Sequence, residues 1–168
     1  MRLRIFAGQL PNNSQSEIAL SKSKFIPKLG IRRTNWTTFR ITPLQSETGD
    51  ILIELREAMN HSWKAYKLYA WGKDEVDPVT KRGSFWMNAA LTMIDSLDTL
   101  WIFNMDKEFE EARNWIDTYV HFDLDNDRVS VFESTIRLLG GLLSAFHLSN
   151  NEVFISKAVS IIVKLLQI

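Results

Sequence analysis

Two segments of the chain place acidic side chains at helical spacing inside strongly apolar sequence. In the later segment Glu133 and Arg137 are four residues apart, so their side chains meet if this segment is a helix. A carboxylate in a buried helix is costly unless it is paired or hydrogen-bonded. The pattern therefore has two interpretations. It is either a structural ion pair or a catalytic acid that lines a cavity, with Arg137 adjusting the pKa of that acid.

The earlier segment carries Asp95 and Asp98, three residues apart. Two carboxylates at this spacing suit acid–base chemistry or metal binding, and a solvated helix face is the alternative. The histidines at 61, 121 and 147 are too scattered to indicate a zinc site. The chain has no cysteine, which excludes a disulfide framework, a thiolate zinc site and a cysteine nucleophile.

The helix predicted over about 131–148 is apolar on two opposite sides, with a narrow polar stripe between them. The stripe consists of Glu133, Arg137, Gly140 and Ser144, with His147 beside it. Such a helix is expected to be buried almost all round, unlike a surface helix. Gly140 and Gly141 stand next to each other in its middle, and each weakens it by about 1 kcal/mol relative to alanine. Another helix or a ligand must therefore approach closely there.

Apolar periodicity predicts five helices after residue 50. They cover about 51–71, 86–104, 107–120, 131–148 and 151–166. No later segment alternates for long like a strand, so the predicted fold class is all-α. The chain divides into residues 1–49, an irregular or poorly ordered arm, and residues 50–168, the helical part. Within the arm, the residues near 36–41 favour a short strand.

Six Trp and ten Phe are many for 168 residues. That density suits a thick helical core or a carbohydrate site, and the core is the simpler interpretation because aromatic side chains bury large areas. The formal net charge of +0 gives no reason to expect nucleic acid or an anionic membrane as a partner. No apolar run approaches the ~20 residues that span a bilayer, and the basic N-terminus lacks the apolar core of a signal peptide.

The segment around Glu133 resembles the signature of the class I α-1,2-mannosidases, glycoside hydrolase family 47. It runs from Val131 to Ala145 and reads VFESTIRLLGGLLSA. Three further segments agree in the same order: residues 63–72, 91–100 and 107–115. The resemblance covers about residues 51–158, and the Phe-Glu-Ser-Thr-Ile-Arg form is closest to the endoplasmic-reticulum branch of the family.

The resemblance implies an (α/α)7 barrel, of which this chain would supply about five helices as a partial barrel. It implies an inverting, calcium-dependent hydrolase that removes terminal α-1,2-linked mannose from high-mannose N-glycans on glycoproteins. Such an enzyme acts in N-glycan processing or glycoprotein quality control, in the lumen of the endoplasmic reticulum or Golgi. The family position of Glu133 is the catalytic proton donor, and Arg137 and Asp95 are expected to support it. The side chain of Glu133 should then face a concavity, with Arg137 within ion-pair reach.

The chain also departs from the family pattern. The family's base and its calcium-binding threonine are expected beyond Ile168, so no metal ligand is expected here and these residues alone should be inactive. A truncated or mis-spliced product fits this length, and no membrane anchor is seen. Asn88, Ala89 and Ala90 replace small glycines of the family. The alternatives are a non-catalytic helical remnant that binds carbohydrate or a partner, and a purely structural all-α domain. An incomplete set of helices should also expose apolar surface.

Overall fold

Five helices account for most of the described chain, so the predicted all-α class is confirmed. The computed structural model describes residues 40, 47–122 and 130–166, which all belong to a unit spanning 35–168. The strand favoured near 36–41 and nearly all of the arm lie outside the described residues, so the boundary at 49–50 remains a prediction. None of the helices in the described ranges is long and apolar enough to cross a membrane.

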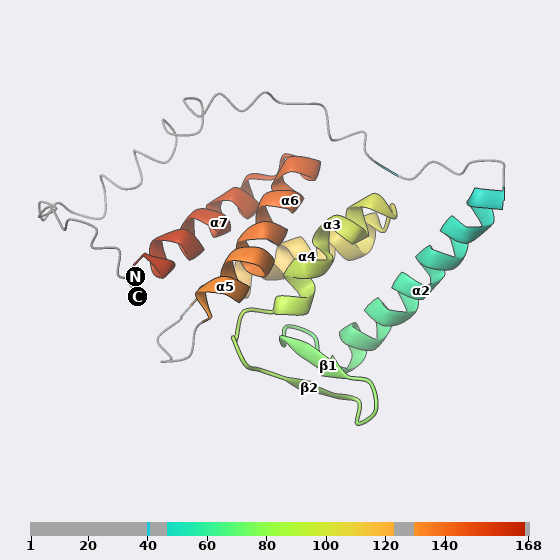
Figure 1. Ribbon diagram of the computed structural model, residues 1–168, viewed down its shortest axis with the longest axis horizontal. Helices are drawn as coiled ribbons and strands as arrows, with labels where there is room; N and C mark the ends of the chain where they lie inside the picture. The colour runs from blue at the N-terminus through green and yellow to red at the C-terminus, as the bar shows by residue number, and fades with distance from the viewer. Residues whose placement is uncertain (1–39, 41–46, 123–129, 167–168) are drawn as a thin grey trace, which may run out of the picture. The chain divides into compact units, whose positions relative to one another are not determined.

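The fourth helix is continuous in the chain but changes its winding. The helices are α2 (Glu47–Tyr69), α3 (Leu91–Ile102), α4 (Asp106–Tyr119), the three-part helix α5 (Val131–Glu133), η3 (Ser134–Leu139) and α6 (Gly140–Ser149), and α7 (Glu152–Leu165) (Figure 1). Segment η3 is a π-helical turn, which is wider than an α-helical turn. Such turns are rare and often occur at functional sites. This one begins directly after Glu133.

A two-stranded hairpin, which the sequence did not predict, follows α2. Strands β1 (Glu75–Asp77) and β2 (Arg82–Ser84) pair antiparallel, with Val76 opposite Gly83. The Asp77 side chain accepts hydrogen bonds from the backbone N–H groups of Val79 and Thr80 and so closes the turn. Strands of three residues are too short to show an alternating pattern in the sequence.

A buried carboxylate organises the segment that leads into α3. Asp74 is fully buried and accepts five backbone hydrogen bonds at 2.7–3.2 Å. The donors are the N–H groups of Trp86, Met87, Asn88, Ala89 and Leu91. Because these groups converge on one side chain, the segment cannot wind as a helix. The prediction that this helix begins near residue 86 was therefore wrong, and α3 begins at Leu91.

The same segment holds two residues in the left-handed region of backbone conformation. Asn88 has a φ of 55° and Ala90 a φ of 53°. A β-carbon disfavours this region, and alanine, unlike asparagine, has no polar side chain to compensate. These are two of the positions where the family resemblance would place glycine. The hydrogen bonds to Asp74 from residues on either side of Ala90 hold this conformation in place.

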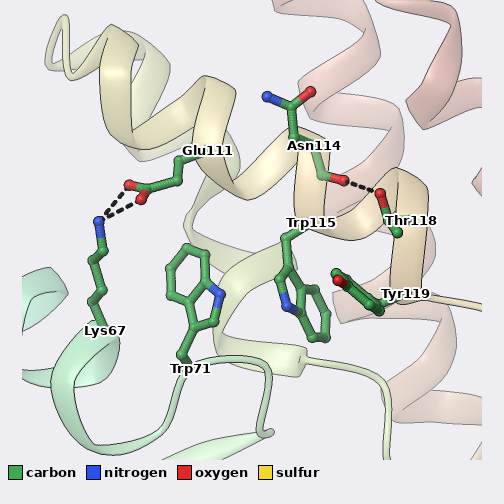
Figure 2. Close-up of a pocket in the computed structure, with 7 residues that line it drawn as sticks. All are labelled: Lys67, Trp71, Glu111, Asn114, Trp115, Thr118 and Tyr119. Atoms are coloured by element: carbon green, nitrogen blue, oxygen red, sulfur yellow. Dashed lines mark hydrogen bonds and ion pairs between the residues drawn. The ribbon is translucent and has the colours of Figure 1, made fainter.

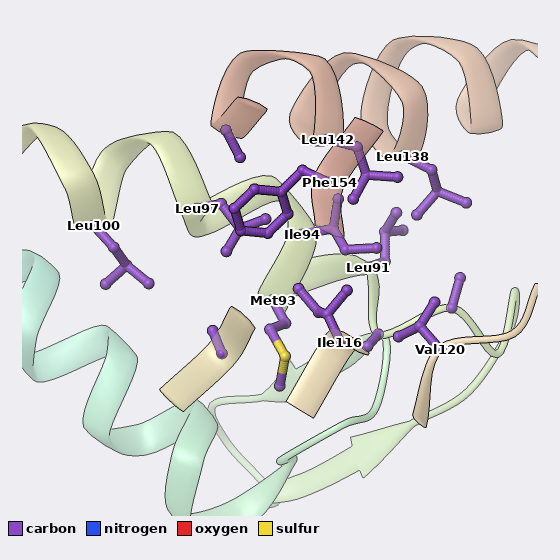
Figure 3. Close-up of a cluster of buried hydrophobic side chains, with 14 of the residues drawn as sticks. Leu91, Met93, Ile94, Leu97, Leu100, Ile116, Val120, Leu138, Leu142 and Phe154 are labelled. Carbon is purple, nitrogen blue, oxygen red and sulfur yellow. The ribbon is translucent and has the colours of Figure 1, made fainter. Parts of the chain in front are cut away.

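The hydrophobic core forms where α3 packs against α4 and α6, and where α7 packs against α6 and α4 (Figure 3). Its α3 members are Leu91, Met93, Ile94, Leu97 and Leu100. Gly141 lies at the closest approach, because a β-carbon there would be 2.8 Å from the carbonyl oxygen of Ile94. A β-carbon at Gly140 would be 3.7 Å from its nearest neighbour. Of the two glycines, Gly141 is the one that the packing requires.

Apolar surface remains exposed, as expected for these helices. The side chains of Val131, Phe132 and Ile136 are 51, 67 and 53% exposed. The expectation that this helix is buried almost all round is therefore wrong for its first two turns. It holds better for α6, where Leu142, Ala145 and Leu148 are buried.

Candidate active site

Asp95 and Arg137 form the closest ion pair of the predicted site. The Nε and Nη2 atoms of Arg137 each lie 2.7 Å from Oδ2 of Asp95. Both side chains are half-buried, and hydrogen bonds between charged groups are the strong ones in proteins. The pair therefore joins α3 to the helix of residues 131–149 through two side chains that are 42 residues apart in the chain.

Glu133 lies near the same guanidinium, at a longer distance. Its Oε2 atom is 3.7 Å from Nη1 of Arg137, and its side chain is 33% exposed. Its backbone N–H donates to the hydroxyl of Ser130, which caps the helix start. The expected proximity of Glu133 and Arg137 is present, but the short bonds of Arg137 go to Asp95. A structural Glu133–Arg137 pair is therefore not what holds Arg137 in place.

A second contact between the same two helices fixes their relative position. The hydroxyl of Ser144 donates to Oδ2 of Asp98 at 2.9 Å. Gly141 lies between Arg137 and Ser144 in the chain and allows α6 to approach the backbone of Ile94. Each acidic residue of α3 is thus engaged by one polar residue of the facing helix. The polar stripe predicted from the sequence faces α3 at these two positions.

The pKa of Asp95 is raised above its ordinary value. Burial is the main cause, because a low-polarity environment disfavours the charged carboxylate. The hydrogen bond and the positive charge of Arg137 oppose this rise without cancelling it, and the charges of Asp98 and Glu133 add to it. Burial and the charges of Asp98 and Glu133 thus act together, against Arg137, to raise the pKa of Asp95.

We expect replacement of Arg137 by methionine to move the titration of Asp95 to higher pH still. Methionine removes the hydrogen bond and the positive charge that now lower the pKa of Asp95, while the burial remains. The measurement is the carboxyl carbon chemical shift of Asp95 followed by NMR across a pH series. Arg113→Met, which removes an ion pair with Glu110 on the surface of α4, is the control and should leave Asp95 unchanged. A lower titration midpoint in Arg137→Met would contradict the geometry described here.

The sequence did not reveal the roles of two further residues, Trp86 and Asp74. The indole ring of Trp86 lies 5.9 Å from the guanidinium carbon of Arg137, and its N–H donates to Glu75. Trp86 was assigned to a helix because nothing in the local pattern reveals the loop imposed by Asp74. The role of Asp74 was missed for the same reason, since the residues it binds are 12 to 17 positions away.

The described residues do not fit a metal site. None of the described His, Asp and Glu side chains form a group of three that could hold an ion. The carboxylates of Asp95 and Asp98 are engaged by Arg137 and Ser144.

Comparison with known proteins supports the resemblance seen in the sequence. The family model described as Glycosyl hydrolase family 47 matches residues 58–168, which include α3, α4 and the helix of Glu133. This match covers more than half of the chain and agrees with the helical fold. The chain belongs to glycosyl hydrolase family 47.

Its relatives include proteins of the endoplasmic reticulum. The human endoplasmic reticulum mannosyl-oligosaccharide 1,2-alpha-mannosidase is 46% identical over 132 residues, which are 79% of this chain and 18% of the human protein. The rat protein of the same name is 53% identical over 102 residues, 61% of this chain and 15% of the rat protein. The pig mannosyl-oligosaccharide 1,2-alpha-mannosidase IA is 39% identical over 176 residues, 94% of this chain and 26% of the pig protein. The chain thus spans about a fifth of the length of these relatives.

Proposed function

We propose that residues 50–168 form the proton-donor part of an α-1,2-mannosidase domain. Its substrate is the terminal α-1,2-linked mannose of high-mannose N-glycans on glycoproteins, and it works in the endoplasmic reticulum or the Golgi. Glu133 is the proton donor. The observation that carries this assignment is the division of contacts around Arg137, whose short bonds go to Asp95 while Glu133 keeps a longer contact of 3.7 Å.

In this proposal Glu133 is protonated before the reaction and gives its proton to the glycosidic oxygen as the bond to the sugar breaks. A carboxyl group does this work best when its environment keeps it neutral near the working pH. The side chain of Glu133 is 33% exposed, and the two short bonds of Arg137 go to Asp95 rather than to Glu133.

Arg137 and Asp95 are positioning residues in this proposal. Asp95 holds the guanidinium through Nε and Nη2, so that Nη1 is turned toward Glu133. An inverting glycosidase also needs a second carboxylate, about 6.5–9.5 Å from the acid, that activates water. We assign no described residue to that role. The calcium ion that the family resemblance implies likewise has no ligand set among the described residues.

A chimeric enzyme tests the assignment of Glu133. The aligned segment of the human relative is replaced by the corresponding segment of this chain, and release of mannose from α-1,2-mannobiose is measured. We expect the chimera to be active and Glu133→Gln to lower kcat/KM at least about a hundredfold, because glutamine cannot donate the proton. Glu152→Gln is the matched control, since Glu152 is exposed at the start of α7, and it should leave kcat/KM within about twofold.

The outcomes separate the proposal from its alternative. A folded chimera that keeps its rate after Glu133→Gln would refute the proton-donor role. A folded chimera without activity would favour the non-catalytic, carbohydrate- or partner-binding remnant.

A further inference from the structure

A surface pocket of about 450 Å³ lies between the C-terminal end of α2 and the outer face of α4 (Figure 2). We call it the Trp71–Trp115 pocket. Its lining includes Lys67, Trp71, Glu111, Trp115, Thr118 and Tyr119. The lining contains none of the residues of the Glu133 site, and the function proposed above leaves it unexplained.

The aromatic rings of this pocket are held in place before any ligand arrives. Trp71 and Trp115 meet edge to face with ring centroids 6.5 Å apart, and Tyr119 lies 5.2 Å from Trp115. Behind them the turn at Gly72, with φ of 76°, is pressed against the Trp115 ring so closely that a β-carbon would collide with it. Rings fixed in this way lose little conformational freedom on binding. Tyr119 is 62% exposed and therefore open to a ligand.

The charged groups of the pocket neutralise each other. Nζ of Lys67 lies 2.6 Å from both carboxylate oxygens of Glu111. The same Nζ lies 5.7 Å from the centre of the Trp71 ring, so the ion pair borders the aromatic surface. Neither a cation nor an anion would find an unpaired opposite charge in this pair. A neutral ligand with hydroxyl groups fits this ion pair, because a hydroxyl can accept a hydrogen bond from the ammonium of Lys67 and donate one to the carboxylate of Glu111.

Further polar groups remain available beside the rings. The indole N–H groups of Trp71 and Trp115 have no hydrogen-bond partner within the described part of the chain, whereas that of Trp86 donates to Glu75. The hydroxyl of Thr118 donates to the Asn114 carbonyl, which leaves its oxygen free to accept. The pocket therefore combines fixed aromatic faces with donors and acceptors at their edges.

We propose that the Trp71–Trp115 pocket is an accessory site that binds a neutral hexopyranose unit of a glycan, separate from the Glu133 site. A pyranose ring has an apolar face of C–H groups that packs on an aromatic ring, and hydroxyl groups around its edge that reach donors and acceptors. This matches the arrangement of rings and polar groups in the pocket. The choice of mannose as the sugar rests on the proposed function, whereas the capacity of the pocket to hold a pyranose does not.

Indole N–H signals in NMR spectra of the 168-residue chain provide the test. We expect added α-1,2-mannobiose to shift the signals of Trp71 and Trp115 with an affinity of about millimolar order, as befits one or two sugar units on a shallow surface. The signals of Trp63 and Trp101, whose indole nitrogens are enclosed in protein, should not move and also report that the chain remains folded. Each signal is assigned with a single Trp→Phe variant.

Substitution of an exposed ring tests the location without endangering the fold. Tyr119→Ala should weaken binding about fivefold, because it removes one aromatic contact. Tyr69→Ala is the control, since Tyr69 is also exposed but does not line the pocket, and it should leave the affinity within about twofold. Glu133→Gln should also leave the affinity unchanged.

Each result decides the proposal. No shift of either indole signal with the sugar would overturn it, as would equal affinities of Tyr119→Ala and the unmodified chain. Shifts produced by a proline-rich peptide but not by mannobiose would assign the pocket to peptide recognition instead. Glucobiose binding as tightly as mannobiose would retain the sugar site and remove only the preference for mannose. Loss of binding in Glu133→Gln would place the sugar at the Glu133 site and so overturn the accessory site. The mannose release measured with the chimera tests only the proposed function, so failure of one proposal can be told from failure of the other.

Discussion

Replacing Asp74 by alanine is expected to lower the free energy of unfolding by about 4 kcal/mol or more, which places it among the most damaging single substitutions. The reason is the number of groups that depend on this side chain. Five backbone N–H groups donate to it, and alanine would leave them without their acceptor. Urea denaturation followed by circular dichroism measures the change.

Asp77→Ala is the matched control for this experiment. Asp77 also accepts two backbone N–H groups, but it is exposed, so water can replace its carboxylate at a cost of about 1 kcal/mol or less. Equal losses for the two variants would show that burial of Asp74 does not matter.

Acid should reveal the same contribution of Asp74. Burial alone would raise the pKa of its carboxyl, but the backbone donors from Trp86, Ala89, Met87 and Asn88 outweigh it and hold the pKa below the ordinary value. The stabilisation is therefore fully present above the unfolded-state pKa of about 3.9, and it is lost as the pH falls through the lower folded-state pKa. We expect the stability difference between the chain and Asp74→Asn to shrink below about pH 4. A difference that stays constant down to pH 2 would contradict this.

Gly141→Ala is expected to cost about 3 kcal/mol of stability, the second largest effect, because its new methyl group would meet the backbone of α3. The β-carbon would lie 2.8 Å from the carbonyl oxygen of Ile94 and 3.0 Å from Cγ2 of the same residue. Backbone cannot rotate away as a side chain does, so α6 must shift outward. Such a shift would lengthen the contacts of Arg137 with Asp95 and of Ser144 with Asp98.

Gly140→Ala is the control that the chain itself supplies. The same methyl group at position 140 makes only an ordinary van der Waals contact, with its nearest neighbour 3.7 Å away, and alanine favours a helix over glycine by about 1 kcal/mol. This variant should be neutral or slightly more stable in thermal unfolding. If the two variants behaved alike, the close approach of α6 to α3 would not be the reason for the glycine at 141.

The helices could be predicted from sequence because apolar periodicity is a local property. The predicted helix of 107–120 lies within one residue of α4, which is Asp106–Tyr119, and that of 131–148 lies within one residue of the observed 131–149. The start of α3 could not be predicted, because Asp74 holds residues 86–91 from a distance. The hairpin was missed because each of its strands has three residues.

The candidate site was predictable in composition but not in pairing. The spacing of Glu133 and Arg137 correctly placed them within ion-pair reach. Arg137 lies closer to Asp95 than to Glu133 because of how α3 and the helix of residues 131–149 cross, and this crossing cannot be deduced from local sequence. The adjacent glycines indicated only that some group approaches this helix closely. The structure was needed to show that Gly141, and not Gly140, lies at this close approach. The catalytic role of Glu133 remains a proposal that derives from the family resemblance and from the contacts described above.

The π-helical turn Ser134–Leu139 has a consequence for how this helix could change by insertion or deletion. A π turn contains one residue more than the α-helical turn it replaces. Because the extra residue is taken up within the wider turn, removal of one residue here would restore regular α-helical winding without the rotation of about 100° that a deletion elsewhere in the helix would cause. Gly141 and Leu142 would keep their packing on α3, and Glu133 would stay on nearly the same side of the helix. This turn is therefore the place in the helix where loss of one residue least changes the direction of the acid.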